Sequence, residues 1–190
     1  MKINLKIFLA GAAAIGLAFA LAAAQDGAKT QTRYYYGPVV YSSADGKTKY
    51  ARTVSLVKRE TLPEDGKIIE TALQPASRPG GKPEEFTAEL SRMDETAVFT
   101  VTELGGSFSG TITFTGGAEW AWTKWRYDIK LSDGGSLKGG GRLSAAGIVT
   151  KKTFTKPDGR VTLISETLKP ISVKRYEALH EKISEGTEAQ

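Results

Sequence analysis

Hydrophobic and polar residues alternate along most of this chain, in stretches that glycine-containing turns separate. The clearest stretch spans residues 107–115, where Phe108, Gly110, Ile112 and Phe114 alternate with serines and threonines. A two-residue period places alternate side chains on opposite faces of a β-strand. The pattern therefore predicts a strand with one buried and one solvated face.

Four Asp-Gly pairs divide the chain into further strands. They are Asp45-Gly46, Asp65-Gly66, Asp133-Gly134 and Asp158-Gly159. A tight hairpin turn needs positive φ, which glycine adopts freely and aspartate tolerates. Together with a Gly105-Gly106 turn, these pairs predict an all-β fold. We expect an antiparallel up-and-down meander of about ten strands that closes into a barrel.

The periodicity changes after the last predicted strand. Val173, Tyr176, Leu179 and Ile183 recur at spacings of three and four residues, after Ser172 and before Gly186. Serine is a favoured helix N-cap, and this spacing gives one apolar stripe. We expect a short C-terminal helix that docks on the sheet. The single barrel domain is then 33–185, after a flexible lead-in at 25–32 and before a frayed tail at 186–190.

The first 24 residues are predicted to be a secretory signal peptide. Lys2 and Lys6 precede an uncharged stretch, Ile7 to Leu21, and Ala22-Ala23-Ala24 supplies a cleavage site. The alternative is an uncleaved anchor, because residues 7–24 are about long enough to cross a bilayer. Cleavage after Ala24 predicts a periplasmic or secreted protein with no stable membrane anchor.

Composition narrows the class of partner. The chain has no cysteine, and removing the leader leaves 24 basic against 21 acidic residues. Disulfides and thiolate metal sites are therefore excluded, so the core alone stabilises the fold. The small positive charge, with signs alternating along the chain, argues against nucleic acid as a partner.

The stretch from Glu119 to Ser132 gives the strongest indication of ligand binding. Trp120 and Trp122 occupy even positions, whereas Trp125, Tyr127, Ile129 and Leu131 occupy odd ones. A β-bulge near residues 123–124 would turn all six side chains to one interior. The alternative leaves Trp120 and Trp122 on the outer face. The candidate ligand-binding residues are Trp120, Trp122, Trp125, Tyr127, Phe99, Phe108 and Phe114, which suit a cavity lining or a completely filled core equally.

Catalytic candidates are few. Glu166 is a weak candidate for an interior acid. It shares one face of its strand with Thr162, Ile164 and Leu168, and the other face carries Val161 and Leu163. Either face is apolar enough to be buried. The other strand carboxylates, Asp128, Glu119, Glu103 and Glu70, are mostly expected to face solvent. The lone His180 has no ligand cluster around it in the sequence, so no metal site is predicted. No cofactor motif appears either.

The order of hairpins followed by a short helix resembles the calycins, the lipocalin-like and fatty-acid-binding-like barrels. The resemblance covers residues 33–168 and the helix at 173–184, and it is one of topology. Where lipocalins carry Gly-x-Trp on the first strand, this chain has Tyr36-Gly37-Pro38. The helix pair that covers fatty-acid-binding barrels is also missing from the pattern. The family's ligand residues are therefore not carried over.

Three functions follow from these patterns. The leading hypothesis is an exported lipocalin-like barrel that binds a small apolar or amphipathic molecule in an aromatic interior. The alternative is a non-catalytic structural or interaction module of the bacterial cell envelope, with a filled core. Such a module would meet an envelope partner through a surface such as the Gln74–Pro83 loop. The third is an isomerase or cyclase that uses Glu166.

Overall fold

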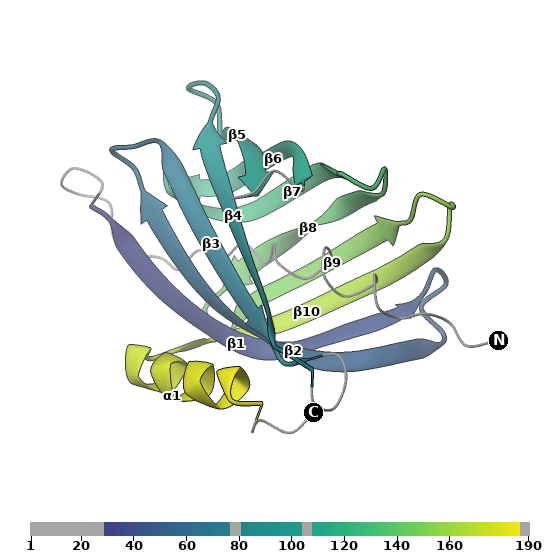
Figure 1. The fold of residues 1–190 in the computed structure, drawn as a ribbon. Helices are drawn as coiled ribbons and strands as arrows, with labels where there is room; N and C mark the ends of the chain where they lie inside the picture. The colour runs from purple at the N-terminus through teal and green to yellow at the C-terminus, as the bar shows by residue number, and fades with distance from the viewer. Residues whose placement is uncertain (1–28, 77–80, 104–107, 187–190) are drawn as a thin grey trace.

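The computed structural model describes residues 29–76, 81–103 and 108–186, which form ten β-strands and one α-helix (Figure 1). The predicted leader and the Gly105-Gly106 turn lie outside these residues. The strands are β1 Gln31–Ser43, β2 Lys49–Leu62, β3 Lys67–Gln74, β4 Glu84–Arg92, β5 Val98–Glu103, β6 Phe108–Ala118, β7 Ala121–Leu131, β8 Ser136–Ser144, β9 Gly147–Thr155 and β10 Val161–Ile171. The helix α1 spans Val173–Ser184.

The strands form one closed antiparallel barrel in which each strand pairs with its neighbours in sequence. Closure comes from the pairing of β1 with β10, from Tyr34 opposite Ile171 to Ser43 opposite Thr162. The predicted all-β meander with a short C-terminal helix is therefore confirmed. The four Asp-Gly turns are confirmed as well, since Gly46, Gly66, Gly134 and Gly159 all have positive φ.

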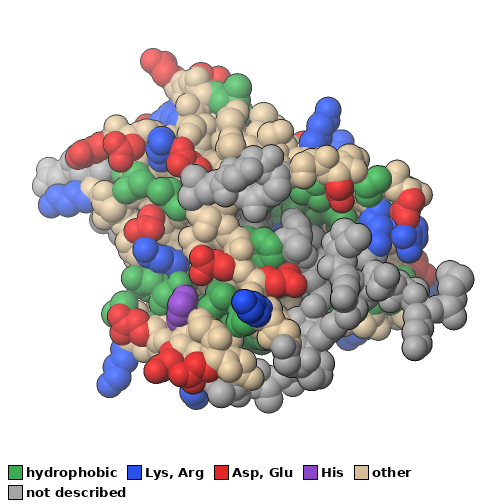
Figure 2. Space-filling view, in the orientation of Figure 1, with side chains coloured by type: hydrophobic (Ala, Val, Ile, Leu, Met, Phe, Trp, Pro, Cys, Tyr) green, Lys and Arg blue, Asp and Glu red, His purple; other side chains and the backbone are tan. Residues whose placement is uncertain are grey.

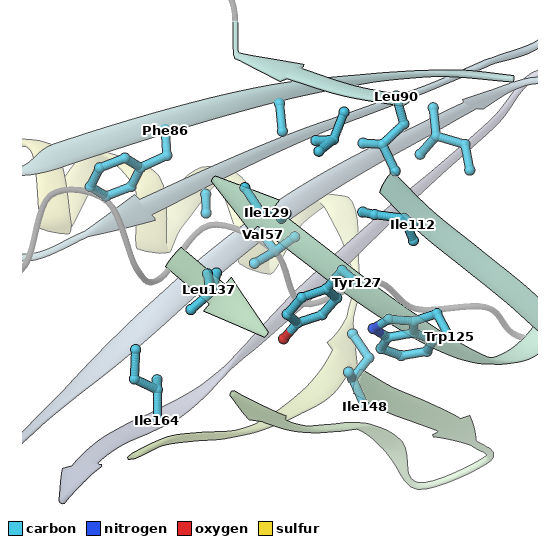
Figure 3. Packing of buried hydrophobic residues seen from close by; sticks show 14 of the residues in the cluster. Val57, Phe86, Leu90, Ile112, Trp125, Tyr127, Ile129, Leu137, Ile148 and Ile164 are labelled. Atoms are coloured by element: carbon cyan, nitrogen blue, oxygen red, sulfur yellow. The ribbon is translucent and has the colours of Figure 1, made fainter. Parts of the chain in front are cut away.

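Alternation along each strand separates an enclosed interior from an outer surface. On β6, Phe108, Ile112 and Phe114 are buried, whereas Ser109, Thr111 and Thr113 are exposed. The interior side chains of all ten strands form one hydrophobic cluster, part of which Figure 3 shows. A closed sheet needs no second layer to bury this face, because the barrel wall surrounds it.

The helix α1 lies on the outer wall, against β1, β2 and β3 (Figure 1). Ser172 caps it by accepting a hydrogen bond from the Arg175 backbone N–H at 3.3 Å. Ile183 is fully buried against Leu56 and Leu73, which point outward from the barrel. The predicted docking stripe is thus confirmed except at Val173, which is 49% exposed because it lies before the helix meets the sheet. Among the described residues, none belongs to a helix with the length and hydropathy that crossing a bilayer requires.

The tryptophan side chains face the interior, but a β-bulge does not cause this arrangement. Trp122, Trp125 and Tyr127 are all buried in the core, and Trp120 packs against it. However, β6 and β7 keep one register, with Thr115 opposite Lys124 and Gly117 opposite Trp122. The predicted bulge was therefore wrong: no residue is inserted between these strands.

Positive-φ residues supply the change of face instead. Gly116 and Gly117 both have positive φ on the strand opposite, and Trp120 has φ 59° in the turn. Side chains other than glycine are strained in this region of φ. The local twist therefore originates in the partner strand β6, and the strand predicted at 119–132 begins only at Ala121.

Docking of α1 can be tested with two truncations on the same helix. Ile183→Ala should reduce the free energy of unfolding by about 2–4 kcal/mol, because it leaves a cavity under the helix. Val173→Ala, at an exposed position, should change it by less than about 0.5 kcal/mol. Urea unfolding followed by tryptophan fluorescence measures both values. Equal effects of the two variants would show that α1 does not stabilise the barrel through Ile183.

Candidate functional site

Four aromatic rings gather at the barrel end where the β4–β5 and β6–β7 hairpins lie. Phe114 and Trp122 are stacked with ring centroids 5.1 Å apart, and Phe99 meets both edge-on, at 5.1 and 5.7 Å. Trp120 adds edge contact with Phe99 at 5.6 Å. These rings contribute a large apolar surface with preferred edge and offset geometries. We call Phe99, Phe114, Trp120 and Trp122 the aromatic cluster.

The other three predicted ligand residues lie deeper in the same interior. Trp125 and Tyr127 project from β7, and the phenol oxygen of Tyr127 points away from its own strand (Figure 3). Gly141 on β8 makes room for Trp125: a Cβ there would lie 2.1 Å from its Cζ2 atom. Phe108 joins the same core, but it comes from the opposite end of β6.

An ion pair crosses between β9 and β10 inside the barrel. Lys152 Nζ lies 2.7 Å from Glu166 Oε2, and both side chains are at most 1% exposed. The Thr150 hydroxyl donates to the same oxygen at 2.6 Å. Both partners therefore bind Oε2, and Glu166 Oε1 is buried with no hydrogen bond within the described chain. The question of which face of β10 is interior is thus settled: Glu166 points inward.

A second ion pair lies on β2 and β3. Arg59 Nη1 is 3.8 Å from Glu70 Oε2, with both side chains fully enclosed. The Arg59 guanidinium also lies 5.8 Å from the ring centroid of Phe114 on β6. Because β2 and β6 are not neighbours in the sheet, Arg59 reaches across the interior to the aromatic cluster. Burial lowers the pKa of Arg59 to about 10, against the opposing effect of Glu70.

Two buried tyrosine hydroxyls are affected by the carboxylates of these ion pairs. Burial raises the pKa of Tyr127 well above its ordinary value, and the carboxylates of Glu166 and Glu70 raise it further. Burial and Glu166 likewise raise the pKa of Tyr41, near the other end of the barrel. Both hydroxyls therefore stay protonated at neutral pH, where each can donate and accept a hydrogen bond. We call Tyr41, Tyr127, Lys152 and Glu166 the polar cluster.

The predicted acids divide between the two faces. Asp128 and Glu119 are exposed as expected, bound to Lys138 and Arg92 respectively. Glu70 was expected outside and is instead fully buried, because Arg59 directly opposite on β2 compensates its charge. The Glu103 side chain lies outside the described set.

The buried cations were missed by sequence reasoning. Lys152 falls in step with Ile148 and Phe154 on β9, and Arg59 falls in step with Val57 on β2. Strict alternation was the available signal, but the usual solvation of lysine and arginine outweighs it.

The other predicted candidate, His180, lies outside the barrel. His180 lies on the outer helix, its ring 5.9 Å from that of Tyr176. Within the described ranges, no three His, Cys, Asp or Glu side chains stand close enough together to hold a metal ion.

Comparisons with protein-family models, curated proteins and solved structures gave no match. The closed antiparallel topology is consistent with a calycin-like barrel, and membership of that group stays a prediction. A barrel with a buried aromatic cluster fits a ligand-binding barrel in general terms.

The buried ion pair can be tested by removing one charge or both. Lys152→Met should reduce the free energy of unfolding by about 3–5 kcal/mol, because Glu166 is left buried without its cation. Adding Glu166→Gln should recover part of this loss. The matched control is Lys138→Met, which breaks an exposed pair with Asp128 and should cost less than about 1 kcal/mol. Urea denaturation of these variants and of Glu166→Gln alone checks the values, and strictly additive effects at positions 152 and 166 would contradict the coupling.

Proposed function

We propose that this protein is an exported barrel that binds one small amphipathic molecule in its interior. The aromatic cluster takes the apolar part of the molecule, and the polar cluster takes its hydrogen-bonding group. The N-terminal leader predicted from the sequence supports export. The wall around the ligand would be rigid, because every strand of the barrel is paired on both sides. A rigid wall would select ligands by shape and by the position of their polar group.

One observation carries the proposal: polar atoms of the interior lack partners within the described chain. They include Tyr127 Oη, Trp125 Nε1 and Glu166 Oε1, all buried. A buried polar atom without a hydrogen bond costs about 1–3 kcal/mol, so a folded protein seldom keeps several together. The Glu166 carboxylate acts electrostatically on the Tyr127 hydroxyl, so one hydrogen-bonding group of a ligand could bind both.

The number of strands is also compatible with a ligand inside the barrel. Ten strands enclose more space than the eight that suffice to hold one small molecule. Two inward positions, Ala72 and Ala88, carry small side chains, which leave room beside the large rings.

A filled, non-catalytic envelope module is the second candidate. The stacked contact of Phe114 with Trp122 favours it, because stacked rings occupy space that a ligand would need. An isomerase or cyclase that uses Glu166 would also bind its substrate inside. A binding measurement therefore separates the ligand-binding barrel and the enzyme from the filled module.

Nile red, an uncharged dye that fluoresces in apolar surroundings, is a suitable probe. We expect saturable binding of one dye per protein, with a change in tryptophan fluorescence. Tyr127→Phe should weaken binding by about three- to tenfold, the value of one hydrogen bond. Tyr50→Phe, at a position 59% exposed, makes the same chemical change and should have no effect. If neither Nile red nor a panel of fatty acids, fatty alcohols and haem binds, interior binding is contradicted and the filled module is favoured.

A further inference from the structure

We propose that the polar group of the ligand is uncharged, as in an alcohol, ketone or amide, and that the barrel discriminates against carboxylates. This inference rests on the proposed interior binding. It concerns which amphipathic molecules fit, and it follows from the charges around the polar cluster.

Each buried cation of the described interior already has a carboxylate beside it. Lys152 lies 2.7 Å from Glu166, and Arg59 lies 3.8 Å from Glu70. The two pairs cancel, so the described interior offers no excess positive charge. Glu84, whose pKa burial raises, adds a further carboxyl group near Tyr41 and no positive charge.

An anionic head group would therefore enter an interior that does not compensate it. Transfer of a carboxylate from water to a buried site is unfavourable unless a cation and hydrogen bonds replace its hydration. Here the nearest free acceptor, Glu166 Oε1, would repel it. A barrel built for fatty-acid anions would instead need a cation without its own carboxylate.

A hydroxyl group matches all of these atoms, and a carbonyl group matches the donors among them. Glu166 Oε1 can accept a hydrogen bond from the ligand, whereas Trp125 Nε1 can only donate one. The Tyr127 hydroxyl can do either, and its raised pKa keeps its proton in place. An alcohol both donates and accepts, so it can bind the carboxylate and a donor simultaneously.

Competition with Nile red compares decanol with decanoate, which share a chain length. At about pH 8 we expect decanol to displace the dye at a concentration at least about tenfold lower. Lowering the pH to about 4.5 protonates part of the free acid. Decanoate should then compete better, whereas decanol should change little.

Glu166→Gln sharpens the test by removing the negative partner of Lys152. In this variant decanoate should gain at least about tenfold in affinity at about pH 8, so the preference narrows or inverts. The matched control is Asp128→Asn, which changes the net charge equally on the outer face. It should leave both affinities as they are.

The outcomes separate the two levels of the proposal. If no probe binds, the interior binding itself fails. If decanoate binds as well as decanol to the unaltered protein at about pH 8, the inference fails while the binding function stands. The wild-type pH comparison decides the matter even if Glu166→Gln does not fold.

A second inference comes from the outer surface. We propose that the outer face of β7, β8 and β9 docks on an anionic membrane surface. Six exposed cations occupy outward positions of these strands, and Asp128 is the one acid among them. We call this face the basic wall: Lys124, Arg126, Lys130, Lys138, Arg142 and Lys151.

The register concentrates the charge. Lys124 lies directly opposite Arg142, and Arg126 and Lys151 flank Gly140 on either side. Without a side chain at Gly140, a shallow groove separates these cations. The face around α1 and β4 differs, since acidic and basic side chains are mixed there (Figure 2). The protein is therefore electrically asymmetric, and an anionic surface would orient it with the basic wall inward.

A bilayer suits this wall better than a nucleic acid does. Among the described residues, the exposed large hydrophobic side chains are Tyr50, Met93 and Val173, and none of them lies on the basic wall. Aromatic side chains for base stacking are therefore lacking there. An exposed array of lysine and arginine is attracted to acidic lipid head groups through charge alone. The amphipathic ligand proposed above would be available at such a surface.

Sedimentation with vesicles tests the docking. The full chain without its leader should bind phosphatidylcholine–phosphatidylglycerol vesicles, and should not bind pure phosphatidylcholine vesicles. Added salt should release it. The combined variant Arg126→Glu, Arg142→Glu and Lys151→Glu should lose binding by at least about tenfold while still taking up Nile red.

A control of equal charge decides whether position matters. Lys47→Glu, Lys82→Glu and Lys174→Glu together change the net charge by the same amount away from the basic wall. This control should keep most of the vesicle binding. An equal loss in both triple variants, or no binding to the anionic vesicles, would overturn the docking proposal.

Discussion

Pairing of β1 with β10 is the constraint on which the rest of the structure depends. It joins the two ends of the meander, with Tyr34 opposite Ile171, and leaves no open edge. An open sheet would expose unpaired backbone groups at both edges and one apolar face to water. Closure turns that face into an interior. The aromatic cluster and the polar cluster are both consequences of this step, because neither has a neighbouring layer to cover it.

The enclosed charges are unusual for an interior that had only to be stable. Buried ion pairs contribute little to stability compared with apolar side chains of similar volume. Here Lys152 with Glu166 and Arg59 with Glu70 stand in an interior that is otherwise uncharged and mostly apolar. The neutral Tyr127 hydroxyl and the nearby Glu166 carboxylate give this interior hydrogen-bonding capacity. An apolar cluster beside it completes the pattern expected for an amphipathic molecule.

The outside of the barrel is divided as clearly as the inside. The helix α1 covers part of β1, β2 and β3, where Leu56 and Leu73 point outward to receive Ile183. The main contacts of α1 are with β1, β2 and β3, whereas cations occupy the outward positions of β7, β8 and β9. The outer face of β1, β2 and β3 is therefore partly covered by α1, whereas the outer face of β7, β8 and β9 exposes positive charge. Binding inside and docking outside would use opposite faces of the same strands.

The sequence by itself determined the features that local interactions control. Asp-Gly turns, two-residue alternation and the Ser172 cap each depend on residues close in the chain, so the meander and α1 could be predicted. The tertiary structure decided the rest. The inward face of β10 and the burial of Lys152 depend on strands paired across the barrel. Trp122 turns inward because Gly116 and Gly117 twist the opposite strand. Alternation shows that two faces exist, whereas only closure decides which of them is enclosed.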